Sequence, residues 1–75
     1  MLDGNKIREF RLNLGYTAKD IEVLTQDQKY GTCISKSYLE ELERGDKKNP
    51  SFQKVVVLAS ILGCKLDELI TSYEH

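Results

Sequence analysis

The spacing of the apolar residues constrains the fold most, because it is helical along nearly the whole chain. Ile7, Phe10 and Leu14 recur at intervals of three and four residues, and Leu39 and Leu42 repeat that interval further on. Apolar side chains spaced in this way share one face of an α-helix, whereas a half-buried strand alternates at every second residue. The sequence shows no strand-like alternation, so the pattern predicts an all-α protein.

Polar residues mark where the predicted helices begin. Thr17 and Asp20 have the spacing of a capping box, in which each side chain accepts a hydrogen bond from the backbone N–H of the other residue. Ser35 and Ser51 stand at the expected N-cap positions of the third and fourth helices. These signals place three helix starts along the chain.

Glycines mark where the helices end. They are Gly15, Gly45 and Gly63.

Residues 25–33 are polar and are predicted to form a loop, and residues 66–70 are predicted to form a short fifth helix. Ile21 and Leu24 give the second helix its core-facing side. The fourth helix has one continuous apolar face, formed by Phe52, Val55, Leu58, Ala59 and Leu62.

Size and charge limit the possible functions. A chain of 75 residues forms a single domain with a thin core and has little room for an enclosed catalytic cavity. Eleven Lys and Arg residues against twelve Asp and Glu give a net charge of −1. This balance excludes a strongly basic, indiscriminate nucleic-acid binder. If DNA is the partner, the positive charge must gather on one face.

The sequence offers no metal ligand set. Cys33 and Cys64 are far apart, and His75 is the only histidine. We expect both cysteines to be reduced and to act as small buried apolar residues. The longest apolar run, residues 55–59, is too short to span a bilayer, and the N-terminus does not resemble a signal peptide. We therefore expect a cytoplasmic protein without cofactor, metal or membrane partner.

The chain resembles phage-repressor-like (Xre/Cro-type) helix-turn-helix DNA-binding domains. The matching segments occur in the family's order, and they are residues 7–11, 15–17, 34–45, 49–51, 58–59, 62–63 and 66–69. The resemblance implies a five-helix, lambda-repressor-like domain over residues 5–70, with an extended turn between the second and third helices and a short tail over residues 71–75. It also implies a sequence-specific transcriptional regulator of double-stranded DNA that is not an enzyme.

The resemblance further implies which residues contact DNA. The recognition helix, about residues 36–44, enters the major groove. Base contacts are expected from Ser35, Lys36, Ser37, Glu40 and Glu41. Backbone contacts are expected from Thr17, Ala18, Lys19, Tyr38, Lys47, Lys48 and Asn49. Relatives pair an arginine of the first helix with a glutamate of the recognition helix, so Arg11 and Glu43 are expected to form a structural salt bridge.

A homodimer is predicted from extra apolar residues near the C-terminus. Val57 and Ile61 lie four residues apart and off the core-facing stripe of the fourth helix, which suggests a partner surface. The predicted dimer interface consists of Val56, Val57, Ile61, Ile70 and Tyr73. In the alternative, Tyr73 folds back over this ridge.

Departures from the family pattern favour a rival function. Ala18 replaces the usual DNA-contacting glutamine, and Glu22 occupies a place where relatives favour a small residue. The turn is about seven residues longer than usual, and Glu40 and Glu41 repel phosphates unless they read cytosine. The alternative is a protein-interaction module of the same fold that has lost DNA binding. An enzyme is the weakest hypothesis, because no nucleophile–base pair or phosphate-binding glycine loop occurs.

Overall fold

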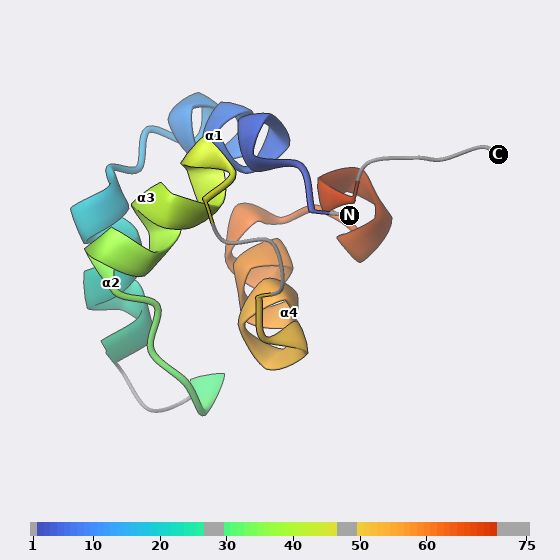
Figure 1. Cartoon of the computed structure of the whole chain (residues 1–75). Helices are drawn as coiled ribbons and strands as arrows, with labels where there is room; N and C mark the ends of the chain where they lie inside the picture. Colours follow the sequence, from blue (N-terminus) through green and yellow to red (C-terminus); the bar gives the residue numbers. More distant parts are fainter. Residues whose placement is uncertain (1, 27–29, 47–49, 71–75) are drawn as a thin grey trace, which may run out of the picture.

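The computed structural model describes residues 2–26, 30–46 and 50–70 and confirms the all-α class (Figure 1). Its elements are α1 (Gly4–Asn13), α2 (Ala18–Gln26), α3 (Lys36–Arg44), α4 (Phe52–Leu62) and η2 (Leu66–Leu69). The predicted fifth helix is the single 3₁₀ turn η2. α2 continues to Gln26, two residues into the stretch predicted as a loop.

α3 lies at the centre of the packing. α3 packs against both α1 and α2, while η2 packs against α1 and α4 (Figure 1). The start of α1 meets the end of α3 so closely that a Cβ on Gly4 would lie 2.6 Å from the carbonyl oxygen of Glu43. Only glycine fits this contact without a shift of the helices.

The two ends of the described chain lie side by side. The backbone N–H of Asp3 donates to the carbonyl oxygen of Leu69 at 2.8 Å. Leu2 and Ile70 form an isolated antiparallel bridge. The segment before α1 is thereby attached to the segment after η2.

Most of the predicted helix ends are confirmed. Thr17 Oγ1 accepts from the N–H of Asp20 at 3.0 Å, and Asp20 Oδ2 accepts from the N–H of Thr17 at 2.9 Å. Gly45 ends α3 with a φ of 83°, a left-handed conformation that glycine adopts without strain. Ser51 stands at the N-cap position of α4, but its side chain makes no capping hydrogen bond. The N-cap of α1, Asp3, was not predicted; it accepts from two N–H groups of the first turn.

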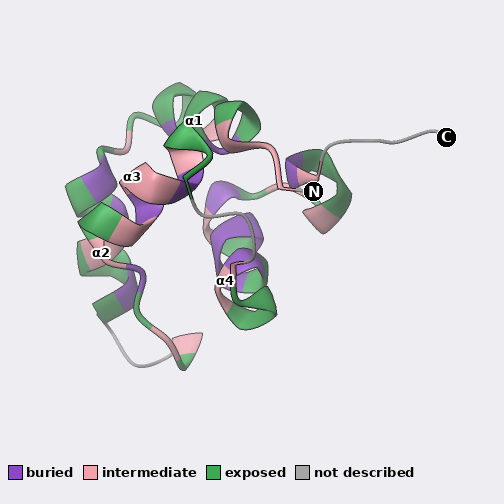
Figure 2. Ribbon diagram, in the orientation of Figure 1, coloured by how far each residue is buried: buried purple, intermediate pink, exposed green. Residues whose placement is uncertain are grey.

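The core is formed where the apolar faces of the helices meet (Figure 2). The largest fully buried apolar side chains are Ile7, Ile21, Ile34, Leu39, Leu42, Leu58 and Leu69. Burial of each such side chain contributes about 1.5–3 kcal/mol, which is the main favourable term for a domain this small.

Three residues predicted on apolar faces are exposed instead. Leu14 is 50% exposed because it follows the last residue of α1. Leu24 is 37% exposed, since Thr25 takes the core-facing position in that turn of α2. Phe52 is 72% exposed. It is the first residue of α4, and this end of the helix lies at the surface, where Ser51 and Gln53 are exposed too.

The predictions for Val57 and Cys33 are also wrong. Val57 is 7% exposed and belongs to the core cluster, so it does not lie on an outward ridge. The buried face of α4 is wider than a single stripe. Cys33 is exposed rather than buried, and Cys64 is half-buried.

Candidate nucleic-acid interface

A buried threonine fixes the segment that leads into α3. Thr25 Oγ1 donates to the carbonyl oxygen of Ile21 and accepts from the N–H of Ile34, both at 2.9 Å. The side chain is 2% exposed, so these bonds are shielded from water. Thr25 thus ties the end of α2 to the residue just before the N-cap of α3. Sequence reasoning missed this role, because a threonine beside a polar stretch gives no signal of its distant partner.

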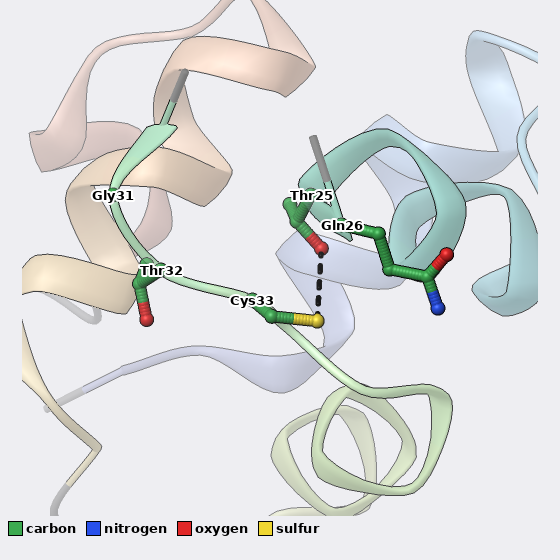
Figure 3. A pocket seen from close by; sticks show the side chains of 5 residues that line it. All are labelled: Thr25, Gln26, Gly31, Thr32 and Cys33. Carbon is green, nitrogen blue, oxygen red and sulfur yellow. Dashed lines mark hydrogen bonds between the residues drawn. The ribbon is translucent and has the colours of Figure 1, made fainter. Parts of the chain in front are cut away.

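Figure 3 shows the small cavity beside this threonine. It has a volume of about 340 Å³ and is lined by Thr25, Gln26, Gly31, Thr32 and Cys33. Cys33 Sγ lies 3.9 Å from Thr25 Oγ1. The cavity therefore forms part of the extended turn between α2 and α3.

The first turn of α3 presents polar side chains outward. Ser35 Oγ caps the helix by accepting from the N–H of Tyr38 at 3.1 Å. Lys36 and Ser37 are exposed, and within the described residues Lys36 forms no ion pair. Glu40 and Glu41, one turn further along, are half-buried. The residues predicted to contact bases therefore lie along one helix, and the basic one is at its exposed start.

The residues predicted to contact DNA at the start of α2 have side chains that are buried or already engaged with a carboxylate. Thr17 is exposed, but its hydroxyl and N–H are both engaged with Asp20. Lys19 is exposed, and its Nζ lies 3.4 Å from Glu22 Oε1. The side chain of Ala18 is buried, so Ala18 can offer a ligand only its backbone. First-turn N–H groups of this kind have no helical acceptor and can bind an anion.

The predicted salt bridge between α1 and α3 is present. Arg11 Nε donates to Glu43 Oε2 at 2.7 Å, and Arg11 Nη2 donates to Glu43 Oε1 at 2.9 Å. A third donor, Arg11 Nη1, binds the carbonyl oxygen of Tyr16 at 2.9 Å. The two side chains are only 11% and 7% exposed. The hydrogen bond from the Glu43 carboxylate raises the pKa of Arg11, whereas burial acts in the opposite direction.

Glu40 shares a surface cavity with three arginines. A surface cavity of about 290 Å³ is lined by Arg8, Arg11, Ala18, Glu40, Glu43 and Arg44. Three arginines and two glutamates line it, and the carboxylate of Asp46, which binds Arg44, brings the charges into balance. Glu40 therefore shares this cavity with two arginines of α1 as well as with Arg44 of its own helix. We refer to this group as the arginine cavity.

The arginines of this cavity are not equally available. Arg11 is committed to Glu43, and Arg44 Nε donates to Asp46 Oδ2 at 2.9 Å. That hydrogen bond raises the pKa of Arg44. Arg8 is exposed and forms no ion pair within the described part of the chain. Arg8 is therefore the uncommitted cation of the cavity.

A tyrosine joins α3 to the start of α4. Tyr38 Oη accepts from the backbone N–H of Ser51 at 3.2 Å. Lys54 Nζ lies 4.3 Å from the centre of the Tyr38 ring, within the range of a cation–π contact. Lys54 was not predicted, because it is 16 residues from Tyr38 along the chain and only the tertiary fold brings the two side chains together.

Some of the remaining predicted residues lie at the surface, and others lie outside the described ranges. Val56 is 42% exposed, and Ile61 and Ile70 are half-buried. Four of the predicted site residues lie outside the described ranges, and they are Lys47, Lys48, Asn49 and Tyr73. The described residues contain no group of three His, Cys, Asp or Glu side chains that could hold a metal ion. Among the helices described, none is long and apolar enough to cross a membrane.

Comparison with known protein families gives a match over most of the chain. A family model described as helix-turn-helix, of the Xre or lambda-repressor-like type, matches residues 7–69, which is most of the chain. No curated protein and no solved structure gives a significant match.

Proposed function

The chain belongs to the Xre-type, lambda-repressor-like helix-turn-helix family, and from this we propose that it is a sequence-specific transcriptional regulator that binds double-stranded DNA as a homodimer. The family consists of DNA-binding regulatory domains that are typically not enzymes. A regulator of this kind works where the DNA is, so the proposal includes a cytoplasmic location.

One observation supports DNA binding most strongly. The first turn of α3 presents Lys36 and Ser37 to solvent. At its other end, α3 is bonded to α1 through the salt bridge between Glu43 and Arg11. A helix that is already ordered in this way can insert its N-terminal turn into a major groove without a further loss of conformational entropy on binding.

The backbone contacts that we propose come from several elements. The start of α2 contributes the main-chain N–H groups of Ala18 and Lys19, and α3 contributes Tyr38. Lys47, Lys48 and Asn49 remain part of this proposal, and Lys54 joins it because it lies against the Tyr38 ring. Each phosphate neutralised by a lysine releases counterions, so the affinity must depend steeply on salt.

We propose that the homodimer forms through the part of the apolar surface that is accessible. Val56 is exposed, and Ile61 and Ile70 are partly so. Tyr73 completes the proposed interface, and Val57 is left out because it is buried in the core. A two-fold dimer doubles the number of phosphate contacts, which a nearly neutral monomer needs for tight binding.

Selection from a random duplex library at low salt, followed by a salt titration, tests this function. We expect enrichment of a palindrome whose half-sites lie about one helical turn apart. Lys36→Glu should abolish the enrichment, whereas Lys65→Glu, an equal change of charge at an exposed residue beside η2, should preserve it. Absence of duplex binding even at low salt would refute the proposal.

A second candidate function is supported by an exposed apolar groove. Leu14, Val23 and Leu24 are 50%, 53% and 37% exposed, and with Gly15, Tyr16 and Asp20 they line a groove of about 410 Å³ between α1 and α2. Such a surface suits a protein-interaction module that has lost DNA binding. Val23→Glu separates the two functions, because it should abolish partner binding and leave duplex binding unchanged.

A further inference from the structure

The stripe of α3 that begins at Lys36 carries two groups with opposite base preferences. Lys36 and Glu40 are four residues apart and therefore lie on the same side of the helix. A lysine donates to O6 and N7 of guanine, whereas a glutamate accepts from N4 of cytosine. The helical rise between them is about 6 Å, and base pairs are about 3.4 Å apart. Where the axis of α3 runs along the groove, the two side chains therefore reach base pairs about two steps apart.

A carboxylate that faces DNA is repelled by the phosphates unless nearby cations offset its charge. Glu40 lies in the arginine cavity beside Arg8, Arg11 and Arg44. The charge of Glu40 also acts on Arg11 and Arg44, but both are bonded to other carboxylates. Among the described residues, Arg8 is the arginine of this cavity that no carboxylate binds. The cavity also includes Ala18 at the start of α2, so Glu40 lies on the side of α3 that faces this helix end.

We propose that Lys36 and Glu40 read a guanine and a cytosine about two base pairs apart in one half-site, and that Arg8 makes this acidic contact tolerable. The inference rests on the proposed function and specifies which bases the site must contain. Lys36 and Glu40 determine specificity, while Arg8 acts through Glu40 as a positioning residue.

The guanine contact is tested on the enriched duplex with a modified base. Replacing the guanine by 7-deazaguanine removes N7, an acceptor for Lys36, and leaves base pairing intact. The wild-type protein should lose about fivefold to a hundredfold in affinity. Lys36→Ala should bind both duplexes equally, and Lys65→Ala, the control, should behave as the wild type. Equal losses for Lys36→Ala and the wild type would overturn the assignment of Lys36.

The cytosine contact is tested by repeating the library selection with Glu40→Gln. Glutamine pairs with adenine, so the preference at that position should change from cytosine to adenine while the guanine position is retained. Asp67→Asn, which removes an exposed charge on η2, should leave both positions unchanged. A cytosine preference that survives in Glu40→Gln would overturn the assignment of Glu40.

The role of Arg8 is tested by combining two substitutions. Arg8→Ala should weaken binding to the enriched duplex by about tenfold in the wild-type background and much less in Glu40→Gln, where no carboxylate needs compensation. Equal losses in the two backgrounds would refute the positioning role. Circular dichroism confirms that each variant is folded. If no variant and no wild-type protein binds any duplex, the proposed function itself fails, which is distinct from binding without these base preferences.

Discussion

Substitutions at Arg11 and Glu43 test whether their buried salt bridge holds the recognition helix in place. Arg11→Met leaves the Glu43 carboxylate, which is 7% exposed, without its partner, and Glu43→Leu does the same to the guanidinium. Leaving one buried charge unpaired costs about 3–5 kcal/mol. A small domain has about 5–15 kcal/mol of stability in total, so either single substitution should remove a large share of it.

The double variant distinguishes this mechanism from a simple loss of contacts. Arg11→Met combined with Glu43→Leu removes both charges and replaces them with apolar groups, so it should cost less than the sum of the single substitutions. Urea unfolding followed by circular dichroism measures all three free energies. The exposed pair Arg44 and Asp46, whose side chains are 59% and 60% exposed, provides the control and should contribute little, because water screens it.

Two results would refute the reasoning. Single variants that lose no more stability than the control pair would show that water screens the bond between Arg11 and Glu43. A double variant whose cost equals the sum of the two single costs would show that the residues act independently. Either result would remove the argument that this bond positions α3.

Three further predictions concern stability. Gly4→Ala should cost about 1–3 kcal/mol in urea unfolding, because the added Cβ collides with the last carbonyl oxygens of α3. Thr25→Val should cost about 1–3 kcal/mol by leaving the buried N–H of Ile34 without an acceptor, whereas Thr25→Ser keeps the hydroxyl and should lose less. Burial raises the pKa of the Cys64 thiol above its ordinary value of 9.0, so its contribution to stability is complete below that pH and is lost as the pH rises through the folded-state pKa. The urea midpoint should therefore fall less at alkaline pH in Cys64→Ala than in Cys33→Ala, which changes an exposed thiol; equal falls would contradict this.

The sequence predicted the features whose partners are close along the chain. The capping box of Thr17 and Asp20 and the cap at Ser35 involve residues three positions apart, so local spacing specifies them. The pair of Arg11 and Glu43 spans 32 positions, and it was predicted only because relatives share it. The family resemblance therefore predicted this long-range pair, which the helical periodicity of the sequence does not indicate.

The features that the sequence did not predict depend on which helices meet in space. Arg8 joins the cavity beside Glu40 only because α1 packs against α3, so the sequence of the third helix alone could not indicate it. Val57 was predicted on an outward ridge from its position on an isolated helix. The packing of α4 buries more than one stripe of that helix, which no pattern within the fourth helix indicates.

The pairing of the two chain ends determines how the domain responds to a pulling force. Leu2 and Ile70 are antiparallel, so a load applied through the outer ends of the chain reaches both residues from the same side. Such a load peels their contacts apart one after another instead of shearing them together. The hydrogen bond from Asp3 to Leu69 breaks after this pair. The contacts of α3 with α1 and α2 are loaded only after that bond has broken. Tension on a tethered copy would therefore open the terminal pairing first, while the recognition helix still keeps its place.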